Sequence, residues 1–363
     1  MNTLMRYLLR EHLKVFAVCL AGLAAVYVVV DFVDKIRRFL NYQAEVKHVL
    51  WYFVLKLPSI LFQIMPLAVL MSTLLTLAIL SRNNEITAMR SSGISLYWVT
   101  IPFLAVAQVV SLFMLWASDA VIPAANQKAE ILREIRIEGQ RPKAVFRGNN
   151  IWVRLGDQTL MKGDLVDDAA PRIYGVSLYR LGPDFSMRQI LHAKELRHED
   201  ARWILLTGTS LTFESDRVVK THPFDRIPIS LNQKPDDFRR TIRVNSDELS
   251  LRDLAAYVER LRRDGYNPAR YAADLFGRTA FPFVCLIMAL IGISLSLMET
   301  GVRGAGLVKV VGYSLLIGFL YWAAHSVALA LGRSDVVPPL LAGWSANISF
   351  LSFAGYLFLH VRQ

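Results

Sequence analysis

The sequence predicts an α-helical membrane protein with six transmembrane helices and an inserted β domain of jelly-roll type. Apolar residues make up 54% of the 363 residues, which is more than an average soluble domain carries. They are concentrated in six blocks without Asp, Glu, Lys or Arg, whereas the middle of the chain alternates apolar and polar residues. Because soluble folds rarely contain six such blocks, we expect this chain to span a membrane.

The apolar blocks set the number and order of the membrane spans. A bilayer core of ~30 Å needs ~20 helical residues, and all blocks but the first reach that length. The first reaches it through Phe32–Val33 if flanking charged side chains extend toward water. Its apolar run continues past Cys19, so we expect an uncleaved helix and not a signal peptide. The blocks are Val15–Val30, Leu57–Leu80, Ser91–Ser118, Thr279–Met298, Val310–Gly332 and Val336–Leu359.

Positive charges predict the orientation of these spans. Arg6 and Arg10 precede the first span, Arg82 and Arg90 lie between the second and third, and Arg303 lies between the fourth and fifth. Because Lys and Arg favour cytoplasmic loops, both chain ends are expected in the cytoplasm and the middle domain in the periplasm. The expected division is 1–122 for spans one to three, 123–248 for the β domain, 249–266 for an amphipathic connector helix and 267–363 for spans four to six.

The stretch between the third and fourth spans predicts β-strands followed by one soluble helix. Short alternating segments at roughly ten-residue spacing, separated by Gly, Asp and Pro, are typical of a sandwich or jelly roll. The helix is expected to begin at a capping box formed by Ser250 and Asp253 and to end near Gly265. The strand segments are Val145–Arg154, Ile173–Leu181, Trp203–Phe213 and Arg217–Lys220.

A basic cluster follows the first span on the side where the charge rule does not expect it. Lys35, Arg37 and Arg38 lie there, with Asp34 beside them. These charges are either incidental, because the other loops outweigh them, or a docking site for an anionic group at the outer membrane surface. Arg and Lys both suit phosphate, Arg through a fork of donors and Lys through a point charge.

Residues 82–93, between spans two and three, predict a short amphipathic helix that ends at Gly93. Glu85, Ala88 and Met89 are expected to share one face of it. The segment is either a solvated loop helix or a knob that docks in a groove of a cytoplasmic partner, with Glu85 pairing a basic residue there. In the second interpretation, the coupling residues are Arg82, Glu85, Met89 and Arg90.

Motifs for enzymatic chemistry are absent from the sequence. The nearest approach to a phosphate-binding loop, Gly301–Gly306, lacks the Lys-Ser/Thr pair, so the chain is not expected to hydrolyse ATP by itself. No zinc-protease or serine-hydrolase motif occurs, and the histidines of the β domain lack metal-ligand spacing. We therefore predict no catalytic residue, metal or cofactor.

Three ionisable residues lie within or beside the later spans, where such groups are functional candidates. Asp274 and Arg278 are four residues apart, so we expect them to pair with each other. His325 is expected to hydrogen-bond a neighbouring helix. Cys19 and Cys285 lie in apolar blocks and are expected to act as small packing residues.

Over nearly its whole length the chain resembles the lipopolysaccharide-export permeases LptF and LptG, and the G type more closely. The layout of three spans, a β domain and three spans is similar. Asp31, however, stands where the G-type pattern has a lysine, which puts the full cationic site in doubt. The local patterns that carry the resemblance are Phe32–Arg38, Leu80–Gly93, Leu254–Tyr257, Gly265, Arg270–Tyr271, Pro282 and Val337–Leu341.

The resemblance implies a permease subunit of an ABC transporter in the bacterial inner membrane. Such a subunit pairs with an LptF-like paralogue, two copies of a cytoplasmic LptB-like ATPase, a membrane-anchored LptC-like protein and a periplasmic LptA-like bridge, and no nucleic acid takes part. The substrate is lipopolysaccharide, whose lipid A phosphates would meet Lys35, Arg37 and Arg38. The coupling glutamate of the family falls on Glu85.

Two other functions stay open at this point. A lipid-modifying membrane enzyme would need catalytic groups gathered at one membrane face and would act without ATP. A scaffold of an ATPase complex would have no lipid path, so a lipid bound between the spans would argue against it.

Overall fold

A computed structural model describes residues 2–42, 45–138, 144–147, 150–155, 158–167, 172–182, 184, 186–199, 202–214, 217–229, 246–263, 265, 267–297 and 307–360. The chain divides into two compact units. The helical unit comprises Met1–Arg133, Ser246–Ala255 and Pro268–Gln363, and the β unit comprises Glu134–Asn245 and Ala256–Asn267. The loop Gly301–Gly306, including Arg303, lies outside the described residues.

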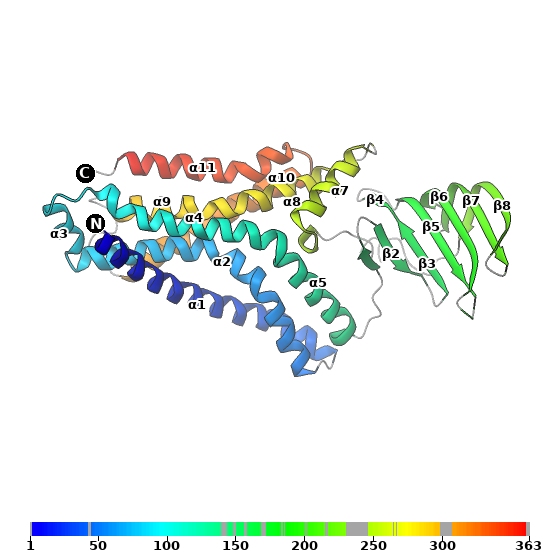
Figure 1. Cartoon of the computed structure of the whole chain (residues 1–363), viewed down its shortest axis with the longest axis horizontal. Coiled ribbons are helices and arrows are strands. Elements are labelled where there is room, and N and C mark those ends of the chain that lie inside the picture. Colours follow the sequence, from blue (N-terminus) through cyan, green and yellow to red (C-terminus); the bar gives the residue numbers. More distant parts are fainter. Residues whose placement is uncertain are drawn as a thin grey trace. The chain divides into compact units, whose positions relative to one another are not determined.

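The six predicted membrane spans are confirmed in the described part of the chain. They are Thr3–Asn41, Val46–Arg82, Leu96–Ala120, Ala269–Leu297, Val308–Arg333 and Pro339–Leu359, each long and apolar enough to cross a bilayer. Figure 1 shows the start of α1 and the end of α11 at the same end of the helical unit as α3. The helices are α1 Asn2–Asn41, α2 Val46–Arg82, α3 Glu85–Ser91, α4 Leu96–Ala120, α5 Ile122–Leu132, α7 Leu251–Arg263, α8 Ala269–Ala280, α9 Val284–Leu297, α10 Leu307–Arg333 and α11 Pro339–Leu359, with short helical turns at η1 Arg133–Ile137, η2 Ser246–Glu248 and η3 Phe281–Phe283.

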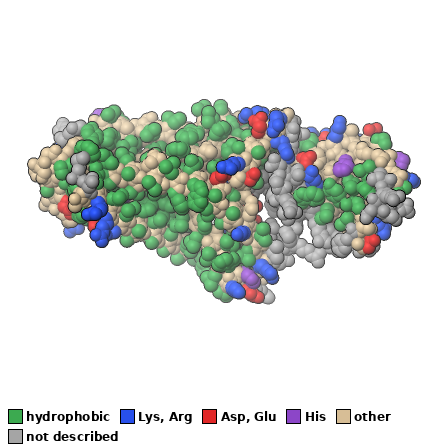
Figure 2. Space-filling model, viewed as in Figure 1, with side chains coloured by type: hydrophobic (Ala, Val, Ile, Leu, Met, Phe, Trp, Pro, Cys, Tyr) green, Lys and Arg blue, Asp and Glu red, His purple; other side chains and the backbone are tan. Residues whose placement is uncertain are grey.

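The core of the helical unit lies between α2 and α9. Leu70 and Leu74 of α2 pack with Val284, Met288 and Ile291 of α9, and all five are buried. In the most apolar stretch of α2, 67% of the residues are buried, against 6% in α1 and 17% in α10. Helices α1 and α10 are therefore peripheral in this chain, and their apolar side chains face lipid or another protein. Figure 2 shows the broad hydrophobic surface that results.

The fourth span is interrupted at Pro282, and a neighbouring helix compensates for the break. A proline lacks the N–H that continues the helical hydrogen-bond ladder, and η3 separates α8 from α9 at this point. Asn347 of α11 donates from Nδ2 to the Ala280 carbonyl (2.7 Å) and accepts from the Tyr321 hydroxyl (2.6 Å). Such bonds between helices are what make a proline tolerable at membrane depth.

The predicted pairing of Asp274 with Arg278 is wrong. Asp274 accepts from Arg333 Nε (2.6 Å) through one oxygen and from the Ser246 hydroxyl (2.5 Å) through the other. Arg278 donates instead to three backbone carbonyls, those of Ser246, Leu249 and Ser118, at 2.6–2.9 Å. Four-residue spacing in a helix permits an ion pair. The guanidinium of Arg278 instead hydrogen-bonds to the carbonyls at the end of α4 and around η2.

His325 is held by ring packing and not by the hydrogen bond that we expected. Its ring stacks on Tyr321 at 5.7 Å and lies 5.7 Å from the Phe281 ring, and its Nδ1 has no hydrogen-bond partner. Both cysteines are buried, as predicted for packing residues.

The β unit contains one antiparallel sheet with strand order β1-β2-β3-β5-β6-β7-β8, and β4 also pairs with β5. Three predicted segments fall within single strands, whereas Val145–Arg154 covers two strands, β1 and β2. Strands β3, β4 and β6 were missed, β6 because its charged residues hide the alternation. Gly175 of β5 has φ +62°, where a Cβ atom would meet the Asp164 carboxylate, so this bend requires glycine. The strands are β1 Ala144–Arg147, β2 Asn150–Arg154, β3 Thr159–Gly163, β4 Leu165–Asp167, β5 Arg172–Leu181, β6 Met187–Glu199, β7 Arg202–Glu214 and β8 Arg217–Ile229.

The connector helix has the predicted ends. The Asp253 N–H donates to Ser250 Oγ (3.0 Å), so Ser250 caps the start of the helix, and the Ser250 hydroxyl donates to Asp253 Oδ2 (2.7 Å). Gly265 follows the helix with φ +81°, in the left-handed region that favours glycine.

Candidate functional site

Helix α3 is a seven-residue knob whose two ends are fixed by local backbone bonds. Asn84 precedes it in the left-handed conformation, with φ +61°. At its other end Gly93 has φ +79°, its N–H donates to the Arg90 carbonyl (2.9 Å), and the Ile94 N–H donates to the Met89 carbonyl (3.0 Å). This pair of bonds is the Schellman motif, so the predicted stop at Gly93 is confirmed.

Packing holds α3 in place, because so short a helix is not stable by itself. Ile86 and Met89 are 3% and 8% exposed and lie in one apolar cluster with Leu8, Leu80 and Leu96. Met89 therefore points into the chain and anchors the knob. We expected Met89 to share one face of α3 with Glu85 and Ala88, but Met89 is buried in the core, whereas Ala88 is exposed and Glu85 is half-buried.

The outer surface around α3 includes Glu85 of α3 and Arg82 at the end of α2. Arg82 is exposed at the end of α2. The Tyr7 hydroxyl donates to Glu85 Oε2 (2.9 Å), and the Asn83 side chain donates to Oε1 (3.3 Å). Tyr7 is 78 positions away in the sequence, so no local pattern could have identified it as a neighbour of the glutamate.

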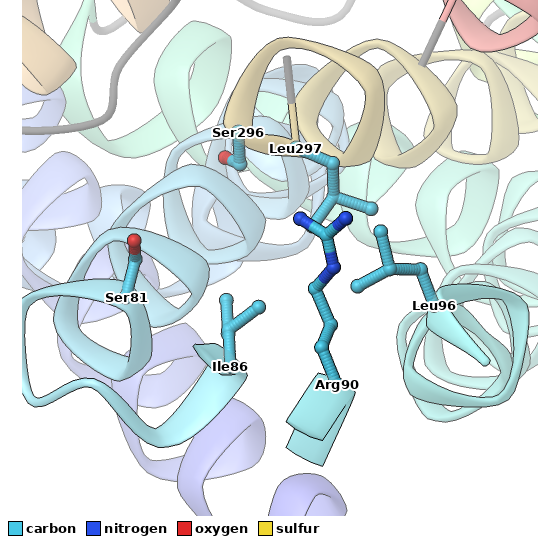
Figure 3. Close-up of a pocket in the computed structure, with 6 residues that line it drawn as sticks. All are labelled: Ser81, Ile86, Arg90, Leu96, Ser296 and Leu297. Atoms are coloured by element: carbon cyan, nitrogen blue, oxygen red, sulfur yellow. The ribbon is translucent and has the colours of Figure 1, made fainter. Parts of the chain in front are cut away.

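Arg90 differs from Arg82 in that it is half-buried over a shallow hollow (Figure 3). Its side chain extends between Ile86 and Leu96 toward Leu297 at the end of α9. Ser296 lines the same hollow, and its hydroxyl has no hydrogen-bond partner. Arg90 thus covers the junction of α3, α4 and α9 with its apolar stem.

The predicted basic cluster lies in the last turns of α1, at the end of the helical unit away from α3 (Figure 1). Lys35 makes an ion pair with Asp31 one turn earlier (2.8 Å), and its ammonium lies 5.5 Å from the centre of the buried Tyr52 ring. Arg37 is exposed, and the side chain of Arg38 lies outside the described residues. Asp31, the departure from the G-type pattern, therefore neutralises part of the charge of Lys35.

A further cation, Lys56 of α2, belongs to this end of the unit and was missed in the sequence. It follows Tyr52 by one turn, so it lies on the helix face against which Lys35 packs. Lys56 donates to Asn126 Oδ1 (3.2 Å), and the Asn126 amide donates to the Asp247 carbonyl (3.1 Å). The available signal was one lysine isolated in an apolar run between Leu50 and Leu80.

The described residues contain no group of three His, Cys, Asp or Glu side chains that could hold a metal ion. The chain instead has two polar sites joined by α1. Tyr7 meets the glutamate of α3 near one end of this helix, and Lys35 and Arg37 lie near the other. With 28 positions between Tyr7 and Lys35, the two sites are about 42 Å apart along the helix axis.

Comparisons with known proteins agree with this layout. The family model described as lipopolysaccharide export system permease LptF/LptG matches residues 6–360. The permease protein LptG of Haemophilus influenzae is 22% identical over 355 residues, which cover 97% of this chain and 96% of that protein. LptG of Escherichia coli K12 is 21% identical over 344 residues, which cover 91% of each chain. This six-span chain with its inserted β domain belongs to the LptF/LptG family of lipopolysaccharide export permeases.

Proposed function

We propose that this chain is the G-type permease subunit of an ATP-driven transporter in the bacterial inner membrane. It extracts lipopolysaccharide from the outer leaflet and passes it to a periplasmic LptA-like bridge. The family match over residues 6–360 is the main support, and the resemblance to LptG proteins favours the G type. In this proposal α3 and both chain ends are cytoplasmic, and the β unit is periplasmic.

The energy for extraction comes from a separate protein. Moving acyl chains into water costs ~0.8 kcal/mol per CH₂ group, so a lipid with several chains needs an external source of work. This sequence has no phosphate-binding loop. We therefore assign ATP hydrolysis to two copies of an LptB-like ATPase, and the second half of the membrane channel to an LptF-like paralogue, with an LptC-like protein bound beside them.

The lipid path would begin at the outer end of α1. Lys35, Arg37 and Arg38 would bind the phosphates of the headgroup, and Lys56 lies close enough in the fold to add a fourth cation. The exposed apolar residues of α1 and α10 would form a lateral gate for the acyl chains, since the chain itself leaves both helices largely uncovered. The apolar side of the β sheet would then shield these chains from water.

The knob around α3 would receive the movement that ATP hydrolysis produces in the ATPase. Its outer side presents Arg82 and Glu85, while Met89 fixes its inner side to the core. A short helix that is anchored in this way moves together with the helices on which it packs. This is required of a contact that passes motion from the ATPase to the membrane spans. Arg90 would support the same junction from the hollow beside Leu297.

A reconstituted transporter tests the assignment of Glu85. We expect Glu85→Ala to abolish ATP-driven release of lipopolysaccharide from proteoliposomes, because the charged contact to the ATPase is lost. Thr87→Ala, at an exposed position of the same helix, should release lipid at the wild-type rate. Normal release by Glu85→Ala would remove this residue from the coupling contact.

Photocrosslinking to the lipid tests the cationic site. Replacing Lys35, Arg37 and Arg38 together by Gln should weaken crosslinking at the outer end of α1 by tenfold or more, since a phosphate loses its partners. The matched control replaces three exposed cations of the β unit by Gln, so the two triple variants have the same net charge. These cations are Arg188, Lys194 and Lys220. Equal crosslinking by the two triple variants would exclude a headgroup site at Lys35–Arg38.

A further inference from the structure

We propose that Tyr7 is a positioning residue that makes α1 the lever between the coupling helix and the headgroup end. Through its bond to Glu85, a movement of α3 would shift the outer end of α1, where Lys35 lies. The inference rests on the proposed transport function and adds to it a route through named residues of this chain.

The contact between Tyr7 and Glu85 leaves room for a partner. Tyr7 occupies one carboxylate oxygen (2.9 Å), Asn83 occupies the other (3.3 Å), and a carboxylate accepts about four hydrogen bonds in all. The Tyr7 side chain is 41% exposed, so the pair is open to solvent. A basic side chain of the ATPase can therefore bind Glu85 while Tyr7 stays bonded to it, which gives a continuous polar connection from the motor to α1.

Apolar packing also holds the first turns of α1 against α3. Leu8 is fully buried in the cluster that contains Ile86 and Met89 of α3. His12, one turn later, is also fully buried, and its ring lies 4.7 Å from the Phe103 ring of α4. The start of α1 is thus fixed both to α3 and to the helices on which α3 packs. The hydrogen bond of the Tyr7 hydroxyl would set the direction in which a movement of α3 displaces α1.

Between Leu20 and Phe32, α1 has little to restrain it within the chain. Only 6% of its most apolar stretch is buried, and Val26, Val29 and Val30 are all at least 60% exposed. One polar contact occurs in the middle of the described helix, from the Tyr27 hydroxyl to Gln63 Oε1 (2.7 Å). The last turns of α1 pack on α2 again, where Phe39 is 2% exposed and its ring lies 5.4 Å from that of Tyr52. A tilt of α1 about its fixed start would therefore carry the first turns of α2 with it.

The helix is long and continuous enough for a small tilt to matter. It spans Asn2–Asn41 as one helix, and its sequence contains no proline. Over the ~42 Å between Tyr7 and Lys35, a tilt of ~5° would move the lysine by ~4 Å, which is more than the length of a hydrogen bond. A movement of that size is sufficient to place a cation against a phosphate or to withdraw it.

The variant Tyr7→Phe tests this route in the reconstituted complex with its ATPase, because it keeps the ring and removes only the hydroxyl. We expect complex assembly and ATP hydrolysis to persist and the lipid released per ATP to fall about three- to tenfold. Tyr27→Phe, which removes a comparable bond between α1 and α2, should keep the ratio within about twofold of wild type. A wild-type ratio in Tyr7→Phe would overturn the proposal.

A double-mutant cycle separates a route through Glu85 from a general loss of stability. If Tyr7 acts through the glutamate, adding Tyr7→Phe to Glu85→Gln should lower the lipid released per ATP no further. Two independent, multiplying effects would overturn the proposal. Release that is unchanged in Glu85→Ala would instead refute the coupling assignment itself, so the two failures are distinguishable.

Spin-label distances provide a readout that does not depend on lipid release. Labels at Val33→Cys of α1 and Val327→Cys of α10, in a chain with Cys19 and Cys285 replaced by Ala, should change separation by several ångströms when ATP is added. Tyr7→Phe should reduce that change by at least half. An ATP response that is absent in the parent chain, or equal in the variant, would exclude α1 as the lever, even if Tyr7→Phe assembled poorly.

Discussion

The close approach of α8 and α11 yields a quantitative test of the packing that positions the fourth and sixth spans. A Cβ atom at Gly343 would lie 2.7 Å from the carbonyl carbon and the Cβ of Phe276 and 2.9 Å from the Gly277 nitrogen. Two of these three atoms belong to the backbone, so no side-chain rotation relieves the overlap. Ordinary contact begins at 3.4 Å, so Gly343→Ala would force the two helices apart by roughly 0.7 Å.

Two opposing terms decide the sign of the effect. Alanine gains up to ~1 kcal/mol over glycine in a helix, whereas overpacking a close interface costs about 1–3 kcal/mol. Gly355 of the same helix has nothing within 4 Å of its position for a Cβ atom, so Gly355→Ala has only the favourable term. We therefore expect Gly343→Ala to be about 1–3 kcal/mol less stable than Gly355→Ala.

Thermal unfolding of the purified chain in one detergent measures this difference. We expect the midpoint of Gly343→Ala to lie about 2–8 °C below that of Gly355→Ala, since ~1 kcal/mol corresponds to a few degrees for a chain of this size. Comparing the two variants removes the helix-propensity term, which they share. Equal midpoints would show that α8 and α11 separate at no cost, and the close contact would then not hold the spans in position.

Two further variants test the interrupted span and the anchoring of α3. Asn347→Leu leaves the Ala280 carbonyl and the Tyr321 hydroxyl unpaired, so it should lower the free energy of unfolding by about 1–3 kcal/mol in the same melting assay. Tyr321→Phe should cost roughly half as much, and equal or reversed values would contradict these two hydrogen bonds. Met89→Gln buries an amide in the apolar cluster and should speed hydrogen exchange of the α3 amides at least tenfold, whereas Thr87→Gln should not; unchanged exchange in Met89→Gln would show that packing does not hold the helix.

Features set by local chemistry could be predicted from the sequence. A span needs only enough consecutive apolar residues to cross the bilayer, so the six spans were identified from composition and length. The stop of α3 at Gly93 and the cap that Ser250 provides to the Asp253 N–H depend on residues within a few positions of each other. The ion pair between Asp31 and Lys35 was not predicted, although it has the same local character, with its residues four positions apart.

Which side of a helix faces the core was decided only by the fold. Spacing shows which residues share a face, but it does not say whether that face meets solvent or other helices. For that reason Met89 was grouped on one face with Glu85 and Ala88, although it packs in the cluster around Leu8 and Leu80. Strand β6 was missed on similar grounds, since its charged residues are accommodated by neighbouring strands that the local pattern does not contain.

The partners of polar side chains also came from the tertiary structure. Asp274 and Arg278 are close in sequence, yet each binds groups 28 to 160 positions away, because the fold places Arg333, Ser246 and backbone carbonyls within their reach. Tyr7 meets Glu85 for the same reason. The sequence by itself determined which six stretches are long and apolar enough to cross a bilayer, since that depends on stretches of about twenty residues. The tertiary structure decided which distant groups touch, since hydrogen bonds act over about 3 Å and only the packed chain brings those atoms together.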